Sequence, residues 1–134
     1  MKTSQVLVAA AALGAALITA ASAATSVPHI RSATTANRHV VVVYTLGELI
    51  PGRLLVATRA QTAPNGRFVQ SNVLFGEALI GKRLAGGAYR TRSRHTLRPG
   101  RYYVELSGTV VGLDCTPKKP CPTDWSNIRR VVVK

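Results

Sequence analysis

Both cysteines of the chain, Cys115 and Cys121, lie in the segment DCTPKKPCPTDWSN, residues 114–127, and their spacing limits the chemistry they can do. A structural zinc site needs four ligands, and none of the three histidines is near this segment in the sequence. A thioredoxin-like motif has two residues between its cysteines, whereas five residues separate this pair. We therefore expect neither a metal site nor a redox motif here.

A row of arginines offers a different chemistry in YRTRSRHTL, residues 89–97. Side chains two positions apart on a β-strand share a face, so Arg90, Arg92 and Arg94 should lie in one row, with neighbours about 6 to 7 Å apart. Guanidinium groups bind phosphate or sulfate through paired hydrogen bonds. The alternative is a solvated strand face, because exposed charges often contribute nothing specific. Together with the next corner and the cysteine segment, the candidate anion-binding residues are Arg90, Arg92, Arg94, Arg98, Arg101, Lys118 and Lys119.

Residue types for catalysis are sparse. The chain has 5 Asp and Glu residues in total, none of which form a close pair, and it has no G-x-S-x-G motif. Alternation along residues 89–97 places His95 on the inward face beside Leu97, where a hydrogen-bonded structural histidine is expected. We expect no enzyme activity, no catalytic residue and no cofactor.

The charge is strongly one-sided, with 18 Lys and Arg residues against 5 Asp and Glu residues and a formal net charge of +13. A charge of this size attracts polyanions, and it bears on partners rather than on fold. The alternative is an arginine-rich surface that reflects only a GC-rich genome. The net charge does not locate a binding site, so the arginine row is the more specific indication of one.

The N-terminus has the pattern of a secretory signal peptide over residues 1–23. Lys2 precedes an apolar run over residues 6–20, and Ala21-Ser22-Ala23 fits the small-x-small cleavage rule. A membrane helix needs about 20 apolar residues, so the run is short for a span, although an uncleaved anchor is the alternative. We expect a secreted, extracellular or cell-surface protein without a membrane span after cleavage.

Export changes the interpretation of the cysteines, because an even number in an oxidising compartment favours a disulfide. A Cys115–Cys121 bridge closes a loop of about seven residues, worth roughly 2.4 kcal/mol in the chain-entropy model. The connection around it, residues 109–127, is 19 residues long, and such connections are uncommon unless they are functional or tied down. The sequence predicts a rigid, covalently closed tip that presents Lys118 and Lys119.

Short β-branched or apolar runs alternate with turn signals along the rest of the chain, and no apolar period of helical length appears. Residues 24–37 are small and polar and are expected to form a flexible leader, with at most a brief edge strand at residues 27–30. The domain itself is expected over residues 38–134, with Pro51-Gly52 among its turn signals. Strands are expected over residues 39–46, 54–60, 89–97, 101–108 and 128–134, with one or two more within residues 67–81.

The segments LRPGRYYVELSG and DWSNIRRVVV resemble the last half of a fibronectin type III-like domain of the kind found in small secreted bacterial proteins. The resemblance implies an all-β protein made of a single immunoglobulin-like β-sandwich, and the family is often adhesive. It also implies a tyrosine corner, for which alternation favours Tyr102 and family spacing favours Tyr103. The family's usual second-strand tryptophan is absent, and residues 46–87 match no part of it. The matching residues are Leu97, Pro99, Gly100, Tyr102, Tyr103, Trp125, Ser126 and residues 131–133.

These features predict a secreted binding or adhesion module that engages an anionic cell-wall or extracellular polymer through the arginine row. The alternative is a structural or assembly protein of the cell envelope that uses its sandwich edges to pair with another envelope protein. Nucleic acid is disfavoured, because no aromatic residues for base stacking are interleaved with the arginines. Neither the identity of the ligand nor the oligomeric state follows from the sequence.

Overall fold

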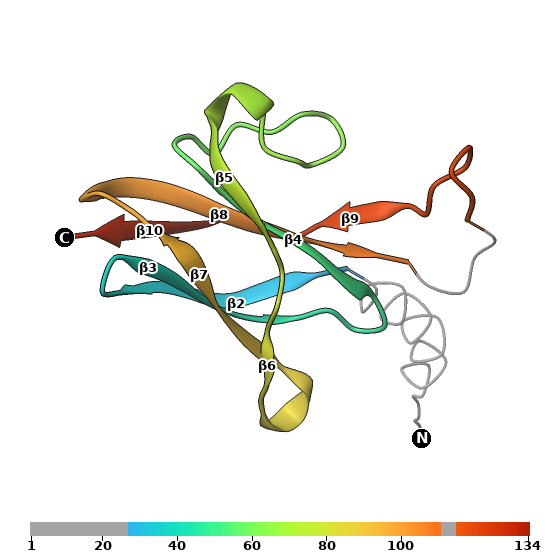
Figure 1. The fold of residues 1–134 in the computed structure, drawn as a ribbon, viewed down its shortest axis with the longest axis horizontal. Coiled ribbons are helices and arrows are strands. Elements are labelled where there is room, and N and C mark those ends of the chain that lie inside the picture. The colour runs from blue at the N-terminus through green and yellow to red at the C-terminus, as the bar shows by residue number, and fades with distance from the viewer. Residues whose placement is uncertain (1–26, 111–114) are drawn as a thin grey trace, which may run out of the picture.

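The computed structural model describes residues 27–110 and 115–134, in which two antiparallel β-sheets form a sandwich (Figure 1). The predicted all-β sandwich is confirmed for these residues, and the arrangement is compatible with an immunoglobulin-like fold. The first sheet contains, in order, β10 (Arg129–Val133), β8 (Gly100–Thr109), β4 (Ile50–Ala57) and β5 (Val73–Ala78), with β9 (Thr123–Trp125) also paired to β8. The second sheet contains, in order, β2 (His29–Ala36), β3 (His39–Thr45), β7 (Tyr89–Thr96) and β6 (Lys82–Arg83).

The predicted signal peptide, residues 1–23, lies outside the described residues, as does Asp114. Within the described ranges, no helix is long and apolar enough to cross a membrane. The only helical elements there are two short 3₁₀ turns, η1 (Gln70–Asn72) and η2 (Ala85–Gly87).

The core lies between the two sheets and follows strand alternation. On β3, Val40, Val42 and Tyr44 are buried, whereas Val41 and Val43 are only half-buried. β3 is a central strand of the second sheet, between β2 and β7, and its outer face is half-buried. Val41 and Val43 form an apolar surface on the outer face of the second sheet. Burial of each large side chain contributes roughly 1.5 to 3 kcal/mol. The main cluster is Ile30, Val40, Val42, Tyr44, Leu46, Leu49, Leu54, Val56, Leu79, Leu97, Val104, Leu106, Val131 and Val133.

The flexible leader expected over residues 24–37 is wrong for residues 29–36, which form β2 and pair with β3. The strand is rich in Ser, Thr and Ala because few of its positions face the core, so it lacks an apolar pattern. The hairpin turn uses Asn37 and Arg38, with φ of 50° and 67°. Two positive φ values in a two-residue loop match the twist of the flanking strands. This turn places β2, the edge strand of the second sheet, next to β3.

The Pro51-Gly52 turn is also wrong, because both residues belong to β4, whose pairing with β8 is irregular between Pro51 and Leu54. The expected strand at residues 54–60 therefore begins earlier and ends at Ala57. A proline interrupts a ladder only where a hydrogen bond is already missing, and the irregularity supplies such a position.

The tyrosine corner is formed by Tyr102, whose hydroxyl donates a hydrogen bond to the Arg98 carbonyl at 2.7 Å. This agrees with alternation and not with the family spacing. Tyr103 points to the other side of β8 and packs against a second, smaller cluster of Leu55, Ala57 and Phe68. The corner fixes the chain between β7 and β8, and so it fixes the end of the arginine row.

Side chains tie the two sheets together near two edges. Near β2, the Asn127 side chain accepts from the Ile30 N–H at 2.7 Å and donates to the Ile30 carbonyl at 3.0 Å. On the opposite side, Glu77 of β5 accepts hydrogen bonds from the backbone N–H groups of Arg94 and His95 at 2.8 to 2.9 Å. Inward-pointing polar groups of this kind satisfy backbone groups at a strand edge. They hold β2 and β7 in fixed positions relative to the first sheet.

Candidate functional site

The arginine row lies on β7 as predicted. Arg90, Arg92 and Arg94 are exposed, and they alternate with Thr91 and Ser93, which are buried. β7 pairs with β3, and its arginines face away from the core. The row therefore lies on the outer face of the second sheet, with guanidinium groups free to meet a ligand.

Two neighbouring strands complete the surface around the row. Arg92 is paired with Val41 and Arg90 with Val43, so half-buried valines lie beside the arginines. On the other side, Arg90 is paired with Lys82 of β6. A surface depression of about 470 Å³, here called the basic groove, is lined by Thr34, Ala36, Asn37, Val41, Lys82, Arg90, Thr91 and Arg92.

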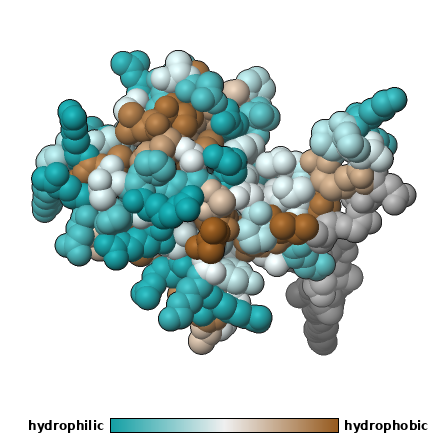
Figure 2. Space-filling view, in the orientation of Figure 1, coloured by the Kyte–Doolittle hydropathy of each residue, from teal (hydrophilic) through white to brown (hydrophobic). Residues whose placement is uncertain are grey.

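Lys82 was missed by the sequence analysis, because β6 has only two residues and therefore no period. The only signal was the Lys-Arg pair itself, followed by a glycine-rich turn. Gly81 lets the chain before β6 pack closely against Tyr44, because a Cβ at this position would overlap the Tyr44 hydroxyl. Thr91 then donates from Oγ1 to the Ile80 carbonyl at 2.9 Å. These contacts place Lys82 beside Arg90, and Figure 2 shows hydrophilic side chains gathered over β6 at the bottom of the view.

No carboxylate neutralises this surface in the part of the chain that the structure describes. That part holds 17 of the 18 Lys and Arg side chains, all but Lys2. Its only ion pair within 4.0 Å joins His95 Nδ1 to Glu77 Oε2 at 2.6 Å. Glu77 and Glu105 are both buried, and both accept backbone N–H groups. The cations of the basic groove are thus uncompensated by the described carboxylates.

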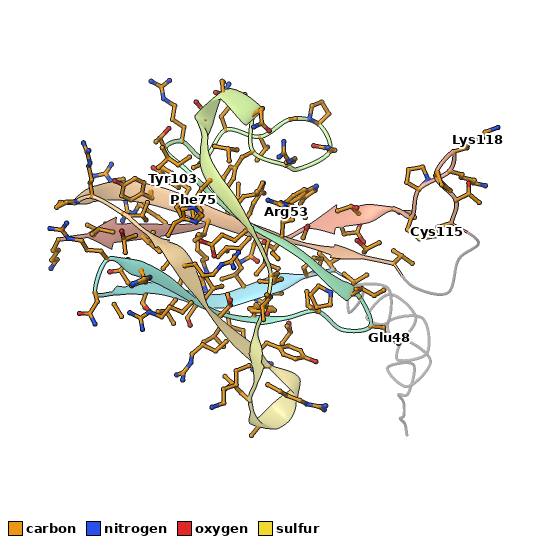
Figure 3. The ribbon with its side chains drawn as sticks, viewed as in Figure 1. Glu48, Arg53, Phe75, Tyr103, Cys115 and Lys118 are labelled. Atoms are coloured by element: carbon orange, nitrogen blue, oxygen red, sulfur yellow. A yellow bond between two sulfur atoms is a disulfide. The ribbon has the colours of Figure 1, made fainter. Side chains whose placement is uncertain are left out.

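The other predicted anion-binding residues do not join the row. Arg101 lies on β8 of the first sheet, paired with Val132 of β10. Arg98 precedes the corner and is fixed there through its carbonyl. Lys118, labelled at the far right end of Figure 3, lies in the cysteine loop well away from β7. Lys119 is the next residue of the same loop. Of the seven predicted anion-binding residues, three therefore form the row on β7 and the other four lie elsewhere.

The predicted disulfide is confirmed: Cys115 and Cys121 are bonded, with Cα atoms 5.1 Å apart. Inside the loop, Thr116 and Lys119 exchange backbone hydrogen bonds of 2.9 and 3.0 Å, and Lys118 and Lys119 are exposed. The long irregular connection expected around it is wrong in part, because β9 pairs with the end of β8. The tip therefore extends a hairpin. Closure of so small a ring stabilises mainly the loop itself.

His95 is hydrogen-bonded as expected, but it is not inward-facing, since 57% of its side chain is exposed. The pairing of β3 with β7 shifts between His39 and Val41, and Ser93 donates from Oγ to the His95 carbonyl at 2.7 Å. This irregularity ends the alternation after Ser93. The imidazole instead stacks on Phe75, with ring centroids 4.5 Å apart.

Glu105 of β8 is a buried acid whose environment the sequence did not reveal. Its Oε1 accepts the Phe68 N–H at 2.5 Å, and its Oε2 has no hydrogen-bond partner among the described residues. Burial raises the pKa of Glu105 to about 7, against smaller opposing effects of the Phe68 N–H and the Arg67 charge. Arg67 itself lies over the Trp125 ring at 5.8 Å. Glu105 therefore lies beneath the segment before β5, outside the basic groove.

Within the described ranges, no group of three or more His, Cys, Asp or Glu side chains has an arrangement that could hold a metal ion. The basic groove is the candidate site because it gathers Lys82, Arg90 and Arg92 without a described carboxylate partner, an arrangement that could bind anions. No protein-family model matches the sequence, and no curated protein matches it significantly.

Proposed function

We propose that this protein is a secreted, immunoglobulin-like binding module of the fibronectin type III-like kind that binds an anionic polymer outside the cell. The basic groove and the arginine row form the binding surface. The observation that carries the proposal is the cluster of Lys82, Arg90, Arg92 and Arg94 on one sheet face without a described carboxylate partner. Cell-envelope and extracellular polymers that carry phosphate, sulfate or carboxylate groups are the class of ligand.

A polymer fits this surface better than a small anion does. The groove is open to solvent, and an exposed ion pair contributes only about 0 to 1 kcal/mol. Screening over about 8 Å at physiological ionic strength weakens each contact further. A chain that carries many charges engages several of the cations at once, and its successive contacts become intramolecular. The half-buried Val41 and Val43 give such a chain an apolar surface to lie on.

The alternative, an assembly protein of the cell envelope that pairs through its sandwich edges, has less support. Asn127 occupies hydrogen-bonding groups of β2 at Ile30, and Glu77 occupies groups of β7. The outer edge of β5 has no partner strand among the described residues and carries an exposed Leu74. Its pairing with β4 is irregular beside Leu74, and bulges of this kind discourage edge-to-edge pairing.

Serine substitutions at Arg90, Arg92 and Arg94 are expected to weaken retention on an anionic matrix. The measurement is the salt concentration that elutes the protein from a phosphocellulose column. The triple variant should elute at clearly lower salt than the unmodified protein, because it lacks the clustered guanidinium groups that bind several phosphates at once.

The matched control is the triple serine variant at Arg53, Arg59 and Arg130, which removes the same charge from exposed positions outside the second sheet. Arg67 is unsuitable as a control, because its guanidinium donates to Gln70 at 2.6 Å and lies over Trp125. The control should elute close to the unmodified protein. Equal losses in both variants would mean that net charge alone explains retention, and the basic groove would not be a site.

A further inference from the structure

A second depression lies at the other end of the same sheet, with a volume of about 550 Å³. We call it the distal groove. It contains two more arginines, Arg31 and Arg83, and both are exposed and without a carboxylate partner in the described part of the chain. It is lined by Val27, His29, Arg31, Thr45, Gly47, Arg83, Gly87 and Tyr89.

The two grooves are linked along the outer face of β3. On β6, Lys82 lines the basic groove, and Arg83, whose side chain alternates to the other face of the strand, reaches the distal groove at the end of the sheet. Along β3, Val41 lines the basic groove and Thr45 the distal groove, four positions further on. With a rise of about 3.4 Å per residue, these two positions are roughly 14 Å apart. A linear ligand that follows the strand direction can therefore reach both grooves.

Arg31 owes its position to a specific irregularity of β2. The register between β2 and β3 shifts between Ile30 and Ser32, so Arg31 is the extra residue. Bulges of this type redirect a side chain. The Arg31 carbonyl accepts a hydrogen bond from the Arg129 guanidinium at 2.6 Å, and Asn127 holds both backbone groups of Ile30. The first sheet thus fixes the bulge that turns Arg31 toward the distal groove.

The lining of the two grooves favours phosphate groups over sugar rings or bases. Four of the five Lys and Arg side chains that line them are arginines, whose planar fork binds phosphate through two parallel hydrogen bonds. Recognition of bases requires exposed aromatic faces, and apart from the His29 imidazole the only aromatic ring that lines either groove is Tyr89. That ring already stacks on Tyr44, with centroids 5.7 Å apart.

We propose that the two grooves form one track for a linear polymer of repeating phosphate groups, which Lys82, Arg90 and Arg92 bind at one end and Arg31 and Arg83 at the other. This inference rests on the proposed function and adds the ligand class and a second subsite. A chain that spans both grooves should bind more tightly than a short one, because the second contact is intramolecular.

The test compares the affinity of the full chain for triphosphate and for long-chain polyphosphate by isothermal titration calorimetry. Triphosphate is too short to span roughly 14 Å along the strands, so the long chain should bind on the order of 100-fold more tightly. The double variant Arg31→Ser/Arg83→Ser should keep the affinity for triphosphate and lose most of this advantage. Retained triphosphate binding also shows that the variant is folded.

The matched control, Arg53→Ser/Arg59→Ser, removes two exposed arginines elsewhere and should keep the long-chain advantage. If the Arg31/Arg83 variant keeps the full advantage, the track is overturned while the basic groove stands. If neither probe binds the unmodified protein, the proposed function fails together with the track. Equal affinity for polygalacturonate, whose charges are carboxylates, would overturn the assignment to phosphate.

Discussion

Replacement of Glu77 by alanine is expected to lower the free energy of unfolding by about 2 to 4 kcal/mol. Only 5% of Glu77 is exposed, and its carboxylate accepts the backbone N–H groups of Arg94 and His95 as well as the His95 ring. Alanine leaves these edge donors of β7 without their acceptor. Because hydrogen bonds to charged groups are stronger than neutral ones, the loss should exceed that of an ordinary buried contact.

Chemical denaturation of the variant measures this loss, with Glu48→Ala as the control. Glu48 is exposed and makes no ion pair with a described residue, so its replacement should change stability by less than about 0.5 kcal/mol. If Glu77→Ala is as mild as Glu48→Ala, the carboxylate does not hold β7 to the first sheet.

The pH dependence gives a second check on Glu77. Burial raises the pKa of Glu77, but the N–H groups of Arg94 and His95 and the His95 ring lower it, and the net pKa lies below its usual value. A lowered pKa in the folded state contributes stability above the pKa of the unfolded chain, and this stability is lost as the pH falls through the folded value. The alanine variant should therefore lose less stability on acidification than the unmodified protein does.

Glu105 should show the opposite pH dependence. Its pKa is raised to about 7 in the folded protein by burial, above the usual value of about 4.3 in unfolded chains. Its contribution is therefore fully present below the unfolded pKa and is lost as the pH rises toward 7 and beyond. Each unit of difference between the folded and unfolded pKa is worth about 1.4 kcal/mol. Above pH 7 the fold carries a buried charge with one oxygen unpartnered by any described group.

Glu105→Gln is expected to remove this cost and to raise stability at pH 8 by about 1 to 3 kcal/mol relative to the unmodified protein. The amide oxygen of glutamine can still accept the Phe68 N–H. At pH 5 the advantage should disappear, because the glutamic acid is then protonated as well. Urea denaturation of both proteins at the two pH values measures the difference. An advantage that does not change with pH would show that Glu105 does not titrate in this range.

Alternation along the chain was sufficient to predict the parts of the fold that depend on local pattern. The outward row of Arg90, Arg92 and Arg94 follows from a period of two, and so does the inward position of Tyr102. The disulfide between Cys115 and Cys121 followed from the cysteine count and the expected compartment. In each case, the relevant physics acts between residues that are close in sequence.

Features that depend on pairing between distant segments could not be predicted in this way. β2 carries few apolar residues, and β6 and β9 are too short to show a period. Lys82 joins the site only through its register with β7. The environments of Glu77 and Glu105 depend on backbone donors from other segments, namely Arg94, His95 and Phe68. No local pattern encodes these contacts.

The contacts that stabilise the sandwich also position the proposed site. Glu77 holds the backbone of Arg94, the last arginine of the row. Asn127 and Arg129 hold the β2 bulge beside Arg31. With Glu77 and Glu105 buried, two of the few carboxylates are removed from the surface, and the arginine face keeps its full charge. The stability of the fold and the shape of the proposed site therefore depend on the same side-chain contacts.

The most direct test of the central claim, that the outer face of the second sheet binds an anionic polymer, is an NMR titration with long-chain polyphosphate. Shifts in the amide nitrogen–proton correlation spectrum locate the binding surface without any substitution. We predict that the largest changes fall on β7 and β6, with further changes on β2 and β3. Changes centred on the loop that carries Lys118 and Lys119, or on the outer face of β4 and β10, would contradict the claim.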